Sequence, residues 1–327
     1  MRAAFSAALA LSLWPGPSPA ETLRLAVLHA ELSAAGPGLL LRDARANAPA
    51  VESAIRRVAS AAPDAILLAG LDWDADGLAL AALQDRLAEA GHPMPHAALP
   101  LPNAGMPTGR DLDGDGFSDG PGDAHGWGRF RGEGTWALLA TAPLLPREER
   151  TGAPWTGGPS GPRRLSSTAH ASYDLVTPAG PLTLIAFHAG PPAFRPENVA
   201  RNAAEVALGA ALIDGACSAF AVLAVANLDP LDGDGEGAVM RDLLSRPDLI
   251  DPRPAAPPDH FDPDHSGDPA LDTAVFERVG GLRTDYVLPA AILSVTAAAL
   301  DRPAEGDPSR HALVRVDLDL PERLPDC

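Results

Sequence analysis

Apolar runs of strand length alternate with amphipathic segments of helical length along the first part of the chain. Residues 23–28 and 65–71 are short apolar runs that predict buried strands. Residues 48–61 and 78–91 repeat apolar positions at helical spacing, and Gly91 provides a stop signal. Strands and helices in alternation favour an α/β layered domain.

The second half of the chain is predicted to contain more strands and two further helices. Strand-like runs occupy residues 135–141, 165–176, 182–188, 219–226, 282–289 and 311–318, and helical patterns occupy residues 197–213 and 238–245. Residues 101–134 and 251–269 have loop composition, rich in Gly, Pro and Asp. Because neither a repeat nor a linker interrupts the pattern, we expect residues 21–327 to form one domain.

The N-terminal segment has the pattern of a secretory signal. Arg2 precedes an apolar run over residues 3–14, and a small-residue cleavage site follows at residues 18–20. We therefore expect residues 1–20 to be removed and the protein to be periplasmic or secreted, without a membrane helix elsewhere. Export would permit a disulfide between Cys217 and Cys327, although a buried, unpaired Cys217 fits the sequence equally well.

The charged residues are strongly unbalanced toward acids. The formal net charge is −18, and all 25 basic residues are arginine. Such a surface opposes binding to nucleic acid, which needs many cationic contacts with phosphate groups. We therefore expect no strong nucleic-acid partner.

Polar residues stand where apolar strand runs end. His29, His188 and Asn227 each follow such a run, and residues at strand ends converge on a common site in layered α/β folds. Near the C-terminus, Asp285 interrupts one strand-like run and His311 opens the next. A carboxylate bound to one ring nitrogen would fix the histidine tautomer and leave the other nitrogen for chemistry. The alternative is that these two residues are unrelated.

The loop DLDGDGFSDGPGD at residues 111–123 resembles a calcium-binding loop. Its candidate ligands are Asp111, Asp113, Asp115, Asp119 and Asp123. The twelfth position is Gly122 rather than a bidentate glutamate, which disfavours a helix-loop-helix site. The alternative is a solvated acidic turn. A second polar loop contains His260 and His265, which we expect to lie on the surface.

Short motifs occur along the chain in an order typical of one superfamily. They are LAVLH (25–29), ILLAGLDWD (66–74), RLSSTAH (164–170), His188 with PPAF (191–194), NLDP (227–230), GDPALDTAVF (267–276), LRTDYVLP (282–289) and SRH (309–311). Together they resemble the endonuclease/exonuclease/phosphatase superfamily, and its exported bacterial members above all. The resemblance implies an α/β fold, a four-layered α-β-β-α sandwich of two mixed sheets packed face to face with helices outside.

The resemblance also implies a reaction, which is the hydrolysis of phosphate esters. In the family a divalent metal, Mg²⁺, polarises the phosphoryl oxygens while water attacks and a histidine stabilises the developing charge. The motifs assign catalytic roles to His311, Asp285, Asn227 and His188, and pocket positions to His29, His170 and Arg310.

Three acids of the family motifs are replaced in this chain. Gly70 stands where the family has a metal-binding glutamate, Val225 where an aspartate positions the water, and Arg310 where the closing motif has an aspartate. Mg²⁺ prefers carboxylate oxygens, so we expect its binding to suffer. Asp72 would point to the same strand face as Gly70 and would offer a partial replacement.

A histidine replaces the family's first-strand asparagine at position 29. If the fold brings His29, His188 and His311 together, the pocket would offer imidazole ligands, which suit zinc or copper better than magnesium. Two functions follow from these residues: a phosphoesterase whose activity is weakened or lost, or a non-catalytic binding module with a calcium-stabilised loop. The sequence determines neither the substrate nor the oligomeric state.

Overall fold

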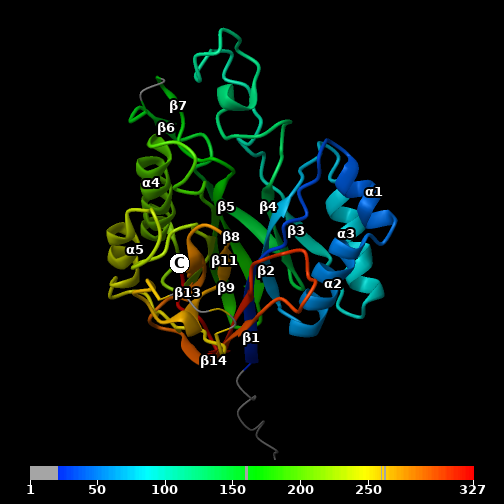
Figure 1. Cartoon of the computed structure of the whole chain (residues 1–327). Coiled ribbons are helices and arrows are strands. Elements are labelled where there is room, and N and C mark those ends of the chain that lie inside the picture. The colour runs from blue at the N-terminus through cyan, green and yellow to red at the C-terminus, as the bar shows by residue number, and fades with distance from the viewer. Residues whose placement is uncertain (1–20, 159–160, 259, 261–262) are drawn as a thin grey trace, which may run out of the picture.

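The computed structural model describes residues 21–158, 161–258, 260 and 263–327. The predicted signal segment, residues 1–20, lies outside the described residues. Two sheets pack face to face, with helices on the outer side of each (Figure 1). This is the four-layered α-β-β-α arrangement that the sequence motifs imply, and that prediction is confirmed.

The first sheet has six strands and carries the N-terminal strand near its middle. Its order is β14 (Ser294–Asp301), β15 (Leu313–Leu320), β1 (Glu21–His29), β2 (Ala65–Leu71), β4 (Thr135–Ala140) and β3 (His96–Ala98). Strands β1 and β2 are parallel, and β15 pairs antiparallel with β1. The outer face is covered by α1 (Leu39–Arg45), α2 (Pro49–Ala61) and α3 (Leu78–Glu89).

The second sheet has five strands. Its order is β13 (Asp285–Pro289), β10 (Phe220–Val225), β9 (Gly180–His188), β8 (His170–Thr177) and β5 (Leu144–Glu149). Helices α4 (Glu197–Ala211) and α5 (Gly237–Leu244) cover its outer face. Helix α4 approaches closely at Gly209, where a Cβ atom would lie 2.4 Å from the ring of Phe187.

The alternation of strand side chains explains the layers. In β1, Leu25 and Val27 belong to the core between the sheets, whereas Ala26 and Leu28 belong to the core beneath α1–α3. Successive strand residues point to opposite faces, so a continuous apolar run can serve both cores. This is why the central strands read as unbroken apolar stretches in the sequence.

Several short or exposed elements lack a sequence signal strong enough to predict them. They are helix α1, edge strands β3, β5 and β14, the two-stranded pairs β6–β7 (Pro154–Trp155, Arg163–Arg164) and β11–β12 (Ala274–Phe276, Gly280–Leu282), and three 3₁₀ turns at Pro121–Asp123, Ile213–Gly215 and Pro269–Leu271. The strand expected at residues 165–176 begins only at His170.

The C-terminus is tied to the second sheet by a disulfide. Cys217, which is buried beside β10, pairs with Cys327, and their Cα atoms lie 4.7 Å apart. Of the two possibilities for Cys217, a disulfide with Cys327 or a buried unpaired thiol, the structure shows the disulfide.

Candidate functional site

The site forms at the end of the sandwich where strands from both sheets finish. Strands β9 and β10 are parallel, so His188 at the end of β9 and Asn227 just beyond β10 emerge on the same side. His29 ends β1 in the other sheet, and its ring contacts that of His188. Asp285 reaches the same place because β13 is antiparallel to β10 and Asp285 pairs with Val225. His311 does so because β15 is antiparallel to β1 and begins two residues after it, at Leu313.

His311 and Asp285 form the pair that the sequence suggests. Nδ1 of His311 lies 2.9 Å from Oδ2 of Asp285, and both residues are buried. The hydroxyls of Thr273 and Thr284 donate to the same carboxylate oxygen at 2.7 and 2.9 Å. Asp285 is the first residue of β13 rather than an interruption within it. The carboxylate therefore orients the ring and leaves Nε2 of His311 for chemistry.

Three imidazole rings gather at the site. His29 stacks on His311 with ring centroids 4.6 Å apart, and it meets His188 edge-on at 5.1 Å. Burial lowers the pKa of His188 to about 4 and that of His29 well below its usual value, with the neighbouring imidazoles adding to the effect on His29. Both rings are therefore neutral at neutral pH and carry lone pairs for protons or metals.

Asn227 is held in an unusual backbone conformation beside His188. Its φ is +51°, in the left-handed region that asparagine tolerates better than most residues. Its amide donates to the carbonyl of Ala189 at 2.8 Å and lies 3.4 Å from Nε2 of His188. The two predicted residues are thus neighbours, although the amide is engaged mainly by the backbone.

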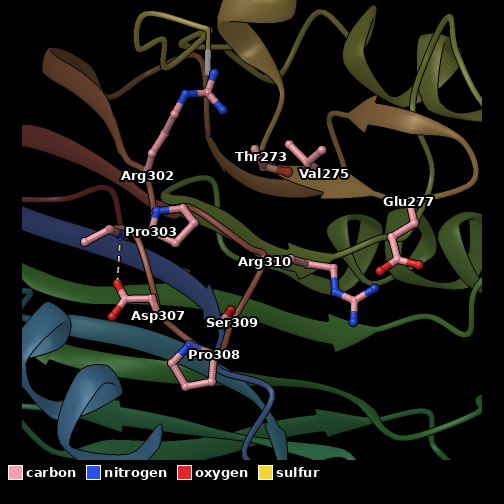
Figure 2. Close-up of a pocket in the computed structure, with 10 residues that line it drawn as sticks. Thr273, Val275, Glu277, Arg302, Pro303, Asp307, Pro308, Ser309 and Arg310 are labelled. Atoms are coloured by element: carbon pink, nitrogen blue, oxygen red, sulfur yellow. Dashed lines mark hydrogen bonds between the residues drawn. The ribbon is translucent and has the colours of Figure 1, made fainter. Parts of the chain in front are cut away.

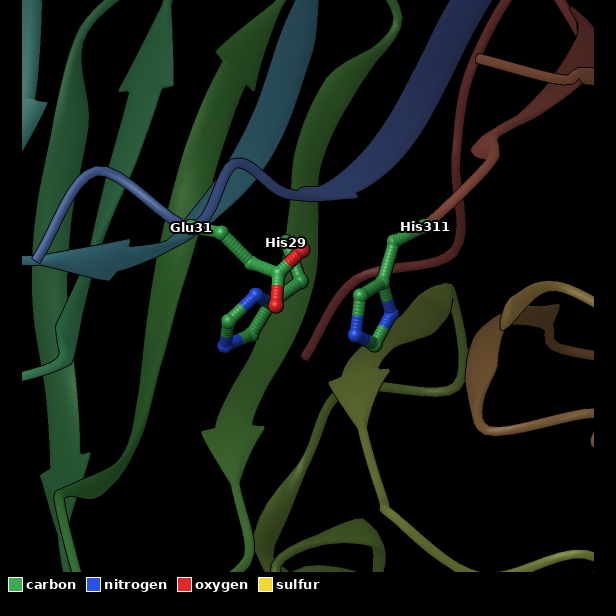
Figure 3. Close-up of side chains that lie close together, drawn as sticks. All are labelled: His29, Glu31 and His311. Carbon is green, nitrogen blue, oxygen red and sulfur yellow. The ribbon is translucent and has the colours of Figure 1, made fainter. Parts of the chain in front are cut away.

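Glu31 is a site residue that the sequence reasoning missed. It lies two residues beyond the end of β1 with φ +50°, and its carboxylate converges with the rings of His29 and His311 (Figure 3). Arg310 binds this carboxylate, through Nε at 2.8 Å and through its backbone N–H at 2.7 Å. The spacing His29-x-Glu31 at a strand end was the available signal.

The structure shows the surroundings of Gly70 and Val225, two positions where the sequence resemblance implies acids. A Cβ atom on Gly70 would lie 2.8 Å from the ring of His29 and 2.9 Å from the backbone nitrogen of Glu31. The space next to position 70 is therefore filled by the ring of His29. Val225 is fully buried in the core between the sheets.

Asp72 does not offer the partial replacement that the sequence suggests, because its carboxylate binds the loop after β1. Gly70 has φ +74° and the pairing of β2 with β4 shifts register there, which interrupts the simple alternation that the sequence argument assumed. The carboxylate of Asp72 instead accepts bonds from the Ser33 hydroxyl and the Ala34 N–H at 2.7 and 2.8 Å. These two hydrogen bonds fix the loop that follows β1.

The donor set does not suit Mg²⁺, which requires several oxygen ligands in octahedral geometry. Among the described residues at the site, the two carboxylates are already engaged, Asp285 by His311 and Glu31 by Arg310. The other side chains that converge there are three imidazoles and the single amide of Asn227. The magnesium site implied by the sequence resemblance is therefore not reproduced.

His170 has a structural environment. It is fully buried, with Nδ1 2.8 Å from the Ser166 hydroxyl and Nε2 3.0 Å from the carbonyl of Glu205, and its ring stacks on Phe187. Burial lowers its pKa to about 3. Because both ring nitrogens are engaged, His170 has no lone pair to offer the site.

The second polar loop is less exposed than the sequence indicates. His265 has a side chain only 6% exposed, and that of His260 is 13% exposed. Both face the buried carboxylate of Asp272, at 3.0 Å from His260 and 3.6 Å from His265. The expectation of surface histidines is therefore wrong, and His260 packs against Gly281, where a side chain would collide with its ring.

The acidic loop gathers part of its predicted ligand set. Carboxylate oxygens of Asp111, Asp113 and Asp115 lie within 4.8 Å of one another, and all three residues are exposed. Asp123 is instead buried and accepts backbone N–H groups of Leu112 and Gly120 at 2.7 and 3.1 Å. Asp119 is exposed. Calcium binding by this loop stays a prediction.

A cavity of about 360 Å³ lies beside the site (Figure 2). It is lined by Thr273, Val275, Glu277, Arg302, Pro303, Ala304, Asp307, Pro308, Ser309 and Arg310. Ser309 and Arg310 directly precede His311, and Thr273 binds the Asp285 carboxylate. The cavity therefore gives a small ligand space next to the paired histidine.

No protein-family model and no curated protein sequence matches the chain. Solved structures do match. An endonuclease/exonuclease/phosphatase from Beutenbergia cavernae DSM 12333 aligns over 91% of this chain and 72% of its own length, with a TM-score of 0.56 and 17% identity. The chain has the endonuclease/exonuclease/phosphatase fold. An endonuclease/exonuclease/phosphatase family protein from Leptotrichia buccalis C-1013-b aligns over 91% of this chain and 100% of its own, with a TM-score of 0.54 and 13% identity.

Within the described residues, no helix combines the length and apolar character needed to cross a membrane.

Proposed function

We propose that this chain is an exported, phosphate-ester-binding protein of the endonuclease/exonuclease/phosphatase fold in which magnesium-dependent hydrolysis is weakened or lost. The observation that carries the proposal is the state of the carboxylates. Asp285 is bound to His311, and Glu31 is bound to Arg310. Loss of a positioned base or acid typically lowers a rate by about 10²–10⁴-fold.

Binding of a phosphate ester has support that does not depend on turnover. His311 is held in one orientation by Asp285, and the guanidinium of Arg310 lies at the adjoining cavity. Arginine and histidine are common donors to phosphate oxygens, and charge-assisted hydrogen bonds are stronger than neutral ones. These two residues would hold the ester, whereas the carboxylates of Asp285 and Glu31 are already bound to His311 and Arg310.

The test is an assay of generic phosphomonoesters and phosphodiesters with added Mg²⁺, Mn²⁺, Ca²⁺ or Zn²⁺. We expect turnover with Mg²⁺ at or near background. Binding of phenyl phosphate, measured by calorimetry, should weaken by about 10-fold or more in Arg310→Ala, since a hydrogen bond to a charged group contributes about 1.5–3 kcal/mol. Arg323→Ala, which alters an exposed arginine of the C-terminal tail, is the matched control. Strong Mg²⁺-dependent turnover that disappears in His311→Ala would contradict the proposal.

Export has support from the disulfide, because such bonds persist in oxidising compartments and are rare in the cytosol of most organisms. Cys217 and Cys327 are paired in the structure. Mass spectrometry of the protein from culture supernatant or periplasm, starting at Glu21 and carrying the oxidised pair, is the expected result. Recovery of the full-length chain only from the cytosol would contradict it.

The alternative function is a non-catalytic binding module with a calcium-stabilised loop. It is favoured by the convergence of Asp111, Asp113 and Asp115. Millimolar Ca²⁺ should then raise the melting temperature of the wild-type protein, and Asp113→Asn should abolish that rise. Asp85→Asn, which changes an exposed acid on α3, should keep it. An unchanged melting temperature with Ca²⁺ would remove this alternative.

A further inference from the structure

His29, Glu31 and His311 converge on one point at the end of the sandwich (Figure 3). Each offers one ligand atom, and the three atoms lie within 4.8 Å of one another. Two come from the end of β1 and the third from the segment before β15, so the antiparallel pairing of these strands sets their separation. Such a group is close enough to share one small ion.

We propose that His29, Glu31 and His311 form a binding site for a divalent transition metal of the zinc class. Two imidazoles and one carboxylate form a three-residue ligand set that such ions use, with a further position left for water or substrate. Mg²⁺ is disfavoured by the same residues, because it needs octahedral oxygen ligands. The site differs in donor chemistry from the magnesium site that the sequence motifs imply.

His311 is already arranged as a metal ligand. Its Nδ1 is held by Asp285, which leaves Nε2 as the nitrogen available to an ion. A carboxylate on the second ring nitrogen is the usual outer contact of a metal-bound histidine, since it fixes the ring and raises its basicity. Asp285 is in turn held by the hydroxyls of Thr273 and Thr284.

The ring of His29 has one nitrogen that is free to bind an ion. Its Nδ1 is buried and has no hydrogen-bond partner among the described residues, which is costly for a polar atom unless something binds it. The ring fits only because position 70 is glycine, with the hypothetical Cβ atom 2.8 Å from the ring. The lack of a side chain at Gly70 therefore makes room for the imidazole ring of His29.

Arg310 binds the carboxylate of Glu31. Its Nε contacts Oε1 of Glu31 at 2.8 Å, and its side chain is 50% exposed. A half-exposed arginine can rotate into solvent when a metal takes its place, and the exposed ion pair that it leaves contributes little, about 0.2–1 kcal/mol. Arg310 and the metal are therefore competitors for Glu31.

The experiment is calorimetric titration of chelator-treated, full-length mature protein with Zn²⁺, and separately with Mg²⁺. We expect about one high-affinity Zn²⁺ per chain and no comparable Mg²⁺ binding. His29→Ala and Glu31→Gln should each weaken Zn²⁺ binding by about 10-fold or more, as loss of ligand-shell contacts does. Arg310→Ala should strengthen Zn²⁺ binding by about two- to five-fold, because the metal would no longer have to displace an ion pair that stabilises Glu31 by up to about 1 kcal/mol.

Two controls make the outcome decisive. His96→Ala changes a histidine on β3 and should leave Zn²⁺ binding unchanged. His265→Ala alters the separate group around Asp272. If Zn²⁺ binding is lost in His265→Ala and kept in His29→Ala, the metal belongs to that group and the proposal is overturned. It is equally overturned if Arg310→Ala weakens binding, or if folded wild-type protein binds no Zn²⁺.

The result is independent of the ester assay. The titration reports binding of the metal alone, so failure to bind Zn²⁺ would leave the proposed phosphate-ester binding untouched. Conversely, absence of any turnover would leave the metal site standing.

Discussion

Gly70 is the residue on which the altered site depends most directly. Its φ of +74° favours glycine, and the ring of His29 and the backbone of Glu31 lie where a side chain would begin. A glutamate cannot be restored at this position without moving both neighbours. The glycine at position 70 and the histidine at position 29 therefore depend on each other.

Gly70→Ala should destabilise the protein by about 2–5 kcal/mol, because a left-handed conformation costs about 1–2 kcal/mol outside glycine and overpacking adds about 1–3 kcal/mol. Urea unfolding measures the difference. Gly91→Ala is the matched control, since Gly91 has φ +86° but open space around it, so it should show only the backbone cost. Equal effects of the two substitutions would show that the contact with His29 is unimportant.

His170 should make stability depend on pH. Its folded-state pKa is about 3, whereas an unfolded histidine has a pKa of about 6.5. Between pH 6.5 and pH 3, His170 is protonated in the unfolded chain and neutral in the folded chain. The free energy of unfolding should therefore fall as pH drops toward 3. The contribution is about 1.4 kcal/mol per pH unit.

Urea unfolding of wild type and His170→Gln between pH 7 and pH 4.5 tests this. The difference between the two curves should shrink as pH falls, because the variant lacks the titrating group. His96→Gln serves as a control for a histidine outside the core. Curves that stay parallel over the whole range would contradict the expectation.

At the scale of elements, the closing segment joins both ends of the chain. Strand β15 pairs with β1 in the first sheet, and the tail beyond it returns to the second sheet, where Leu324 donates to the carbonyl of Ala179 and Cys327 meets Cys217. The tail thus bridges the two sheets at the end of the chain.

Cys327→Ser should lower the free energy of unfolding by about 2–4 kcal/mol. The disulfide spans 110 residues, and closing a loop of that length restricts the unfolded chain strongly. Adding a reductant to the wild-type protein should give the same shift in the unfolding midpoint and should have no effect on the variant. A reductant that shifts neither protein would show that the bond contributes nothing.

At the scale of the whole molecule, charge restricts the range of partners. The net charge is −18, and removal of residues 1–20 with their single charge, Arg2, would leave −19. Arg310, for example, is paired with Glu31. An extended polyanion would meet repulsion over most of the surface.

The protein should therefore not bind a short DNA duplex measurably at about 0.15 M salt, where surface charges are screened beyond about 8 Å. Fluorescence anisotropy with a labelled duplex measures this, and phenyl phosphate serves as the small-ligand comparison. Micromolar DNA binding that weakens as salt rises would show a basic surface that the charge balance conceals.

The sequence by itself determined the layered α/β fold class and most strand and helix positions, and it suggested the pairing of Asp285 with His311 without excluding that the two are unrelated. Those features follow from local periodicity and from motifs whose residues are close in sequence. The tertiary structure alone decided that Arg310 binds Glu31, although 279 residues separate them. It alone decided that Asp72 serves a loop, because the register shift at Gly70 breaks the alternation that a sequence argument must assume. Local patterns specify elements, whereas the neighbours of a site residue depend on how distant strand ends meet.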